Sequence, residues 1–283
     1  MNISSFPPTA NRRDRLLLVL CAASALAVVA LLCLLVISTL GKAAPALSSL
    51  FQAVTETAWA PRAGQFGMLS MIVGSLAVSL LALAIAAPLA VILAGWLVLY
   101  APEFVRAPLR AIYELMSGIP SVVYGLWGLI LLVPLISRLS PPGASLLTAA
   151  IVVALMILPY GVLLIDSRLR AVPLATRQAA LATGMSRFAI FRAVYWPLSR
   201  DGAFRAMVLQ FARAIGETMA VLMVAGNVVA MPDSLLAPVR TLTANIALEM
   251  GYADDAHRAA LYLSGVLLLL AAMLTMAIVR RNP

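Results

Sequence analysis

VPLATRQAALATGMSRFAIFRAVYWP, residues 172–197, is a moderately apolar segment that lies between two long hydrophobic runs of a 283-residue chain. Arginines, among them Arg187 and Arg192, are spread along it. A chain this hydrophobic has little reason to keep such a segment out of the bilayer unless a soluble partner docks onto it. The segment therefore predicts a docking site in the cytosol. The alternative is an amphipathic segment that lies on the lipid surface.

The same stretch predicts two short helices that meet at an angle. Its alanine-rich first part is typical of a helix, and Gly184 can end that helix in a left-handed turn. Phe188, Phe191 and Tyr195 follow at spacings of three and four residues, which places them on one face of a second short helix. Two such helices would present a knob that fits a groove in a partner.

Composition predicts an all-α, polytopic membrane protein. Hydrophobic residues make up 63% of the chain and charged residues 11%, against roughly 25% charged in soluble domains. The mean hydropathy is +1.03, and apolar runs reach the roughly 20 residues that span a bilayer. We expect a polar N-terminal segment at 1–15 and a loop at 41–67 before the core at 68–283. The six expected spans are 16–40, 68–100, 119–139, 145–166, 206–230 and 259–279.

Charge distribution predicts the orientation of these spans. With the N-terminus in the cytosol, 14 of the 20 basic residues fall on the cytosolic side, 5 on the outer side, and Arg213 lies within a span. The positive-inside rule thus favours a multi-pass protein with both termini cytosolic. The same rule accounts for the net charge of +9, so we expect contact with membrane lipid and no nucleic-acid partner.

The chain lacks the side-chain clusters that enzymes need. Cys21 and Cys33 lie in the first apolar run, where we expect them to pack, and His257 is expected to be a solvated surface residue. No zinc, thiol or serine-hydrolase motif is present, and the position five residues before Gly41–Lys42 is Val36, so there is no phosphate-binding P-loop. We expect no metal site and no cofactor in this chain. Energy for active transport would come from a partner or an ion gradient.

Two charges in the fifth expected span give the sharpest functional signal. Arg213 and Glu217 are four residues apart, so on a continuous helix they would share one face. Each costs roughly 2.5–3.5 kcal/mol at the centre of a bilayer. A structural ion pair is one explanation. The other is a polar pathway for an anion, because a guanidinium donates two hydrogen bonds at once to a tetrahedral oxyanion.

A second signal is the sequence Gly118-Ile119-Pro120, which breaks helical regularity at the start of the third expected span. Broken backbone at a membrane is tolerated where it lines a cavity or packs on protein. An ordinary helix start with proline in its first turn is the alternative. Ser121 and Tyr124 supply hydroxyls that could face a pathway.

The segment quoted first resembles the EAA loop of ABC importer permeases. That loop reads Glu-Ala-Ala, three residues, Gly, nine residues, Ile-x-Leu-Pro, and the spacing here matches throughout. Gln178 replaces the family glutamate, which puts a charged contact from that position in doubt. The resemblance implies that residues 168–200 form a coupling loop to a cytosolic ATPase. Its candidate coupling residues are Gln178, Ala179, Ala180, Gly184, Arg187, Phe188 and Pro197.

Further stretches resemble the phosphate-specific ABC permeases of the PstC type. They include TAWAP at 57–61, ELMSGIPSVVYGLWG at 114–128 and ARAIGETMA at 212–220. The resemblance implies a type I ABC importer permease in the bacterial inner (plasma) membrane that moves inorganic phosphate. It implies three partners: a PstA-like permease, a dimeric cytosolic subunit that binds ATP and Mg, and an external phosphate-binding protein. It also places Arg213, Glu217, Ser121 and Tyr124 on the translocation path. Other oxyanions such as sulphate, molybdate or phosphonate, and a secondary anion transporter driven by an ion gradient, are the alternatives.

Overall fold

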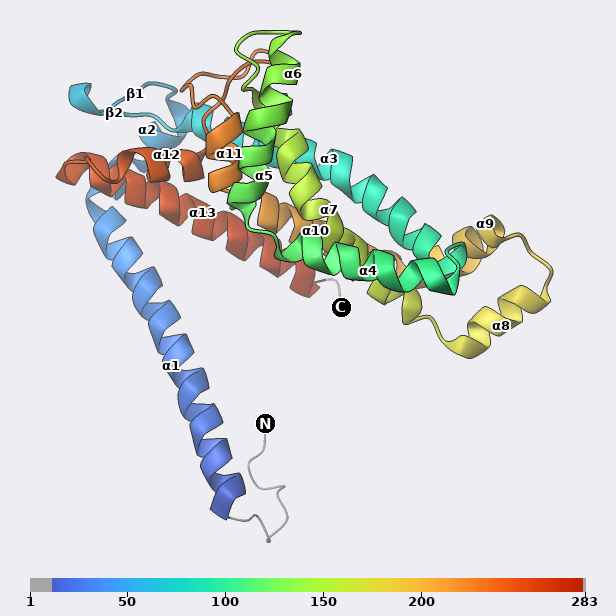
Figure 1. Ribbon diagram of the computed structural model, residues 1–283. Helices are drawn as coiled ribbons and strands as arrows, with labels where there is room; N and C mark the ends of the chain where they lie inside the picture. Colours follow the sequence, from blue (N-terminus) through green and yellow to red (C-terminus); the bar gives the residue numbers. More distant parts are fainter. Residues whose placement is uncertain (1–11, 282–283) are drawn as a thin grey trace.

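The computed structural model describes residues 12–281, and the described chain is almost entirely helical (Figure 1). The exception is one antiparallel hairpin of β1 (Trp59–Ala60) and β2 (Gln65–Phe66), in which Trp59 pairs with Phe66. The predicted all-α class is therefore confirmed. Most of the predicted N-terminal segment, residues 1–11, lies outside the described residues; the first helix begins at Arg12.

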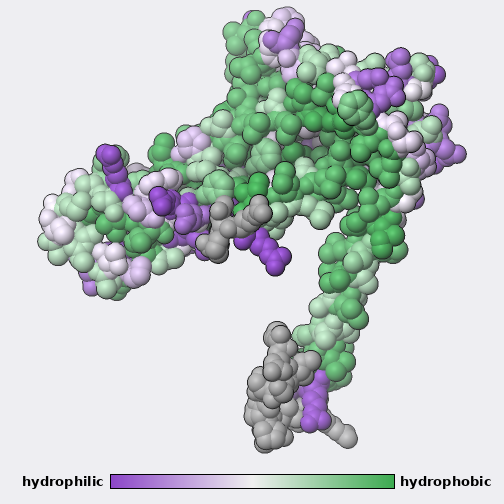
Figure 2. All heavy atoms as spheres, turned by 180° about the vertical axis from the view of Figure 1, so that it is seen from behind, coloured by the Kyte–Doolittle hydropathy of each residue, from purple (hydrophilic) through white to green (hydrophobic). Residues whose placement is uncertain are grey.

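Four of the described helices are long and apolar enough to cross a membrane. They are α1 (Arg12–Ala43), α3 (Leu69–Leu99), α7 (Leu146–Arg170) and α13 (Asp255–Arg281). A fifth candidate is the pair formed by α4 (Glu103–Gly118) and the helical stretch Ser121–Ser137, which is bent by 94°. The count of six spans is not confirmed. Figure 2 shows hydrophobic side chains over the middle of the body and along α1, with hydrophilic ones gathered toward the ends.

The core of the fold is formed where α3, α7 and α10 (Trp196–Ile215) pack together. One row of α3 faces its neighbours at every fourth position, and all but one of its members are glycine or alanine. The row is Gly74, Val78, Ala82, Ala86, Ala90 and Ala94, all buried. Small residues in such a row let helix backbones approach closely, which is how helices associate in a membrane. Pro88 lies inside α3, and the helix continues through it without a break.

The two ends of the body carry different elements (Figure 1). The coupling end holds α8 (Leu174–Ala182) and α9 (Arg187–Ile190). The hairpin end holds the β1–β2 hairpin and α12 (Leu242–Glu249). The predicted loop at 41–67 is structured there: it contains η2 (Ala44–Ser49), α2 (Leu50–Thr55) and η3 (Pro61–Ala63) besides the two strands.

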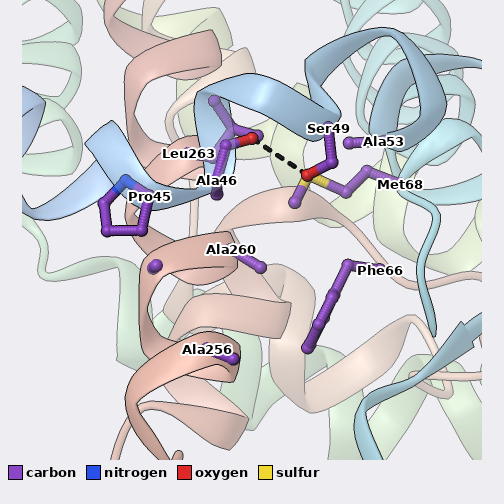
Figure 3. A pocket seen from close by; sticks show the side chains of 10 residues that line it. Pro45, Ala46, Ser49, Ala53, Phe66, Met68, Ala256, Ala260 and Leu263 are labelled. Carbon is purple, nitrogen blue, oxygen red and sulfur yellow. Dashed lines mark hydrogen bonds between the residues drawn. The ribbon is translucent and has the colours of Figure 1, made fainter. Parts of the chain in front are cut away.

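A small apolar pocket lies at the hairpin end between η2, α2 and α13 (Figure 3). Its volume is about 130 Å³, and its walls are alanine, methionine and aromatic side chains. The Ser49 hydroxyl turns back to donate to the Ala46 carbonyl at 3.0 Å. The pocket is therefore a packing cavity and offers no cluster of polar groups to a ligand.

Helix α1 departs from the body along most of its length (Figure 1). It contacts α13 near its C-terminal end, where Ala43 is buried and Lys42 Nζ donates to the Tyr262 hydroxyl at 3.2 Å. The expectation that Cys21 and Cys33 pack inside the protein is wrong for this chain, because both are exposed on α1. An apolar run alone does not say whether lipid or protein covers it.

The fifth expected span differs most from the prediction. Residues 206–230 do not form one helix: α10 begins ten residues earlier at Trp196 and ends at Ile215, and the short helix α11 (Met219–Val224) follows after a break. The chain then continues in irregular structure up to α12. The break falls at Gly216-Glu217-Thr218, which is inside the motif that the sequence singled out.

Candidate functional site

Glu217 lies in the break between α10 and α11 and stabilises the chain there through two hydrogen bonds. Its Oε1 accepts the backbone N–H of Ala220 at 3.1 Å, so the carboxylate caps the first turn of α11. Its backbone carbonyl accepts the Thr243 hydroxyl at 2.8 Å, which ties the break to the start of α12. The carboxylate is thus bound to backbone instead of to the arginine four residues earlier.

Arg213 lies in the last turn of α10, and its side chain is exposed. Among residues 12–281 it has no hydrogen bond and no ion pair with another side chain. The expectation that Arg213 and Glu217 share one helical face is wrong, because α10 ends between them. The physical reason is the break itself: Gly216 ends the helix, and Glu217 is needed as a cap for the next one. The guanidinium therefore remains available to a ligand.

Helix α5 (Ser121–Trp127) brings Tyr124 to this break. Gly125 touches α11 so closely that a Cβ built on it would be 2.9 Å from Ala220 Cα. Tyr124 is almost fully buried, and its hydroxyl donates to the Met116 carbonyl at 2.9 Å across the bend between α4 and α5. The Arg213 charge acts electrostatically on the Tyr124 hydroxyl. Tyr124 is thus within electrostatic range of Arg213, and its neighbour Gly125 packs on the helix that Glu217 caps.

Ser121, the fourth predicted path residue, is the first residue of α5 and directly follows Pro120. It is partly buried, one turn from Tyr124 on the same helix. An open cavity of about 670 Å³ adjoins this bend, and its walls include Glu114, Gly118, Ile119 and Pro120. Sequence reasoning predicted that the broken backbone would line a cavity or pack on protein, and the cavity agrees with the first alternative. Glu114 is exposed at this wall and was not singled out as a site residue.

Gln210 is a polar side chain that sequence reasoning passed over. It is fully buried between α10 and α7, where its Nε2 donates to the Ile157 carbonyl at 3.1 Å. Gly161 makes room for it, since a Cβ there would come within 2.0 Å of the Gln210 amide nitrogen. The signal in the sequence was a lone glutamine one turn before Arg213. The matching glycine, 49 residues away, could not be found from spacing.

The coupling segment has the predicted outline in its first half. Gln178 and Ala179 are exposed on α8, whereas Ala180 is buried against the body. Gly184 has a φ of +70° in a left-handed turn just after α8, so the predicted helix end is confirmed. Leu181 beside it is also exposed, which leaves α8 an uncovered face at the coupling end.

The second half of the coupling segment differs from the predicted short helix. Helix α9 continues through one turn of π-helix, η5 (Phe191–Tyr195), directly into α10. Phe191 packs on Gly95 of α3, and Tyr195 is buried, so only Phe188 of the predicted aromatic face is exposed. Aromatic residues at spacings of three and four indicate one face of a helix, but they do not show whether that helix is short or is the start of a longer one.

Arg187 and Pro197 complete the coupling residues predicted from the sequence. The Arg187 Nη1 donates to the Leu99 carbonyl at 3.2 Å, and its guanidinium lies over the Tyr100 ring at 5.6 Å from the centroid. Arg187 therefore fastens α9 to the end of α3. Pro197 is exposed and directly follows the π-helical turn η5 and Trp196, inside the continuous helical stretch.

A cluster of buried polar side chains lies at the hairpin end. Glu249 on α12 accepts from Arg240 Nη1 at 2.6 Å and from Trp59 Nε1 at 2.8 Å, and its Oε2 lies 2.9 Å from His257 Nε2. The expectation that His257 is solvated is wrong: the residue is 4% exposed. It lies in the first turn of α13, where the Trp59 ring and Glu249 of α12 contact it. Among the described residues, no group of three or more His, Cys, Asp or Glu side chains could hold a metal ion.

Residues 86–282 match the family described as the binding-protein-dependent transport system inner membrane component. The chain belongs to this family. Members are membrane components of transport systems, so the chain is an integral membrane transport subunit and not itself an enzyme. Membership also implies that it works with a second permease and an ATP-binding subunit. The family resemblance predicted from the sequence is confirmed.

Individual relatives cover most of the chain. The phosphate transport system permease protein PstC of Mesorhizobium japonicum is 33% identical over 281 residues, which cover 91% of this chain and 86% of that protein. PstC of Xylella fastidiosa is 32% identical over 246 residues, covering 80% and 76%. The probable ABC transporter permease protein YqgH of Bacillus subtilis is 36% identical over 233 residues, covering 80% and 75%.

Solved structures show the same fold. A bacterial ABC transporter involved in the import of the acidic polysaccharide alginate matches with a TM-score of 0.64 at 14% identity, over 95% of this chain and 96% of that one. The MetNI methionine ABC transporter in an inward facing conformation matches with a TM-score of 0.54 at 19% identity, over 84% and 98%. The predicted ABC importer permease fold is therefore confirmed.

Proposed function

We propose that this chain is the permease subunit of an ATP-driven importer of inorganic phosphate. Relatives named as phosphate transport permeases, at 32–33% identity over most of the chain, support this substrate. The observation that carries it in the structure is the Arg213 guanidinium, which is exposed just before the helix break that Glu217 caps and has no side-chain partner among the described residues. A planar guanidinium offers two parallel hydrogen bonds to a tetrahedral oxyanion.

The roles of the site residues follow from this arrangement. Arg213 would bind the passing anion, and Ser121 would offer it a hydroxyl from α5. Tyr124, whose hydroxyl already donates to the Met116 carbonyl, would line the path and hold the bend between α4 and α5. Glu217 would hold α11 in place through its bond to the Ala220 N–H and would limit how tightly an anion is held. A site that holds its anion too tightly cannot release it, so a negative charge four residues along the chain from the arginine suits transport.

Alternating access would be driven by partners. A dimeric cytosolic subunit would bind ATP and Mg and would dock on the coupling segment at 168–200, contacting the exposed Gln178, Ala179 and Phe188. A PstA-like permease would complete the pathway, and an external phosphate-binding protein would deliver the anion. In this assembly the chain would lie in the bacterial inner membrane with both termini in the cytosol, in line with the positive-inside rule.

The test is uptake of labelled phosphate into vesicles that hold the chain with its three partners. We expect uptake to require ATP and to be unaffected by excess sulphate or molybdate. Block by sulphate would mean another oxyanion is the substrate, and uptake without ATP would mean a secondary transporter. Arg213→Gln should abolish uptake while the complex still assembles, whereas Arg138→Gln, the same change at an exposed position after α6 (Val133–Ser137), should leave it unchanged.

A further inference from the structure

A fully buried carboxylate, Asp166, lies near the coupling end of α7 and was not singled out from the sequence. Two arginines share it. Arg170 Nε lies 2.9 Å from Oδ1 and 3.0 Å from Oδ2, and Arg110 Nε lies 3.1 Å from Oδ2. One negative charge thus holds two positive ones at a site where burial makes each interaction stronger than in water.

The two arginines belong to different helices, α4 and α7. Arg110 is on α4, whose last residue, Gly118, opens the 94° bend into α5 and Tyr124. Arg170 is the last residue of α7, directly before the turn that leads into α8 of the coupling segment. Asp166 is therefore the point at which the helix leading to the proposed path meets the helix leading to the proposed docking site.

The contacts continue from Asp166 into α8. Arg177, in the second turn of α8, donates to the Arg170 carbonyl through Nη2 and to the Val172 carbonyl through Nε at 2.9 Å. The turn between α7 and α8 is thus tied to α8 by a side chain of α8 itself. A continuous set of contacts therefore joins α8 to α4. Arg177 of α8 binds the Arg170 carbonyl, the Arg170 side chain pairs with Asp166, and Asp166 pairs with Arg110 of α4.

We infer that Asp166 and Arg110 are positioning residues that couple a displacement of α8 to the bend between α4 and α5. A displacement of α8 would move the turn to which Arg177 is hydrogen-bonded. Asp166, which is paired with both Arg170 and Arg110, would transmit that movement to α4. Rotation of α4 about its anchored start, where Arg106 donates to the Leu97 and Ala101 carbonyls, would then shift Tyr124 relative to Arg213. The inference rests on the proposed function for its energy source, but not for the identity of the anion.

Arg110→Gln separates this role from a merely structural one. The change removes the ion pair to α4 but leaves the Asp166–Arg170 pair intact within α7, so the buried carboxylate keeps a partner. Arg110→Lys keeps the charge and should restore part of the link. Arg15→Gln is the matched control, because it removes the same charge from an exposed position on α1.

The experiment measures ATP hydrolysis and phosphate uptake on the same reconstituted complex. We expect Arg110→Gln to assemble and to hydrolyse ATP near the wild-type rate while the phosphate moved per ATP falls about tenfold, with partial recovery in Arg110→Lys. A wild-type ratio in Arg110→Gln, a parallel loss of hydrolysis and uptake, or failure to assemble would each overturn the inference. The wild-type arm tests the proposed function separately: if it moves no phosphate, the substrate assignment fails whatever Arg110 does.

Discussion

Gly125→Ala is the change that most directly tests the contact between α5 and α11. A Cβ at this position would lie 2.9 Å from Ala220 Cα and 2.9 Å from Met223 Sδ, where ordinary contacts begin at 3.4 Å. The methionine end can rotate away, but Ala220 Cα is backbone and cannot move alone. The two helices would therefore have to separate by about 0.5–1 Å.

The expected cost follows from that separation. A gap of about 0.5–1 Å forfeits a quarter to a half of each dispersion contact across the interface. Adding one methyl group to a packed interface of this kind costs about 1–3 kcal/mol, which corresponds to a change of roughly 5- to 150-fold in an equilibrium. Because Tyr124 adjoins Gly125, the separation would also carry its hydroxyl away from Arg213.

The assay is the initial rate of phosphate uptake by the reconstituted complex, together with its thermal stability in the same membrane. We expect Gly125→Ala to lower both. Gly118→Ala is the control, because it makes the same chemical change at the nearby bend, where a Cβ would meet nothing within 4 Å. Uptake and stability of Gly125→Ala that equal those of the wild type would refute the close contact on which the site is built.

Two further changes test the packing on either side of this site. Gly161→Ala should destabilise the complex by about 1–3 kcal/mol, because its Cβ would overlap the buried Gln210 side chain, and combining it with Gln210→Ala should cost less than the sum of the two in thermal unfolding. Glu249→Ala should cost about 3–5 kcal/mol, because it leaves Arg240 largely buried without its 2.6 Å partner. Glu249→Gln, which keeps an acceptor oxygen, should unfold at a temperature between those of the alanine variant and the wild type. An alanine variant as stable as the wild type would contradict this account of the hairpin end.

Periodicity and composition predicted those features that depend on neighbours in sequence. The long apolar helices α1, α3, α7 and α13 follow from runs that only a membrane or a core can accept. The left-handed turn at Gly184 follows from the freedom of glycine at positive φ. The motif around Arg213 and Glu217 was also visible, because charges in an apolar run are costly and therefore informative.

Features that join distant residues could not be predicted in this way. Trp59 and Glu249 are 190 residues apart and yet share a hydrogen bond, which buries His257 against expectation. Similarly, Arg110 and Asp166 meet only because α4 folds back onto α7. Spacing rules describe one helix at a time, and they carry no information on which helix comes to lie beside another.

By itself, the sequence determined that the chain is a helical membrane protein with a segment shaped for a partner, and it marked Arg213 as unusual. Only the tertiary structure showed that Arg213 and Glu217 have different contacts: Glu217 caps α11, whereas Arg213 has no side-chain partner among the described residues. The backbone groups at a helix end need partners outside the helix. Here the Thr243 hydroxyl donates to the Glu217 carbonyl, and the Glu217 carboxylate accepts the Ala220 N–H. That break leaves the Arg213 guanidinium without a side-chain partner among the described residues, and the proposed anion site rests on this arrangement.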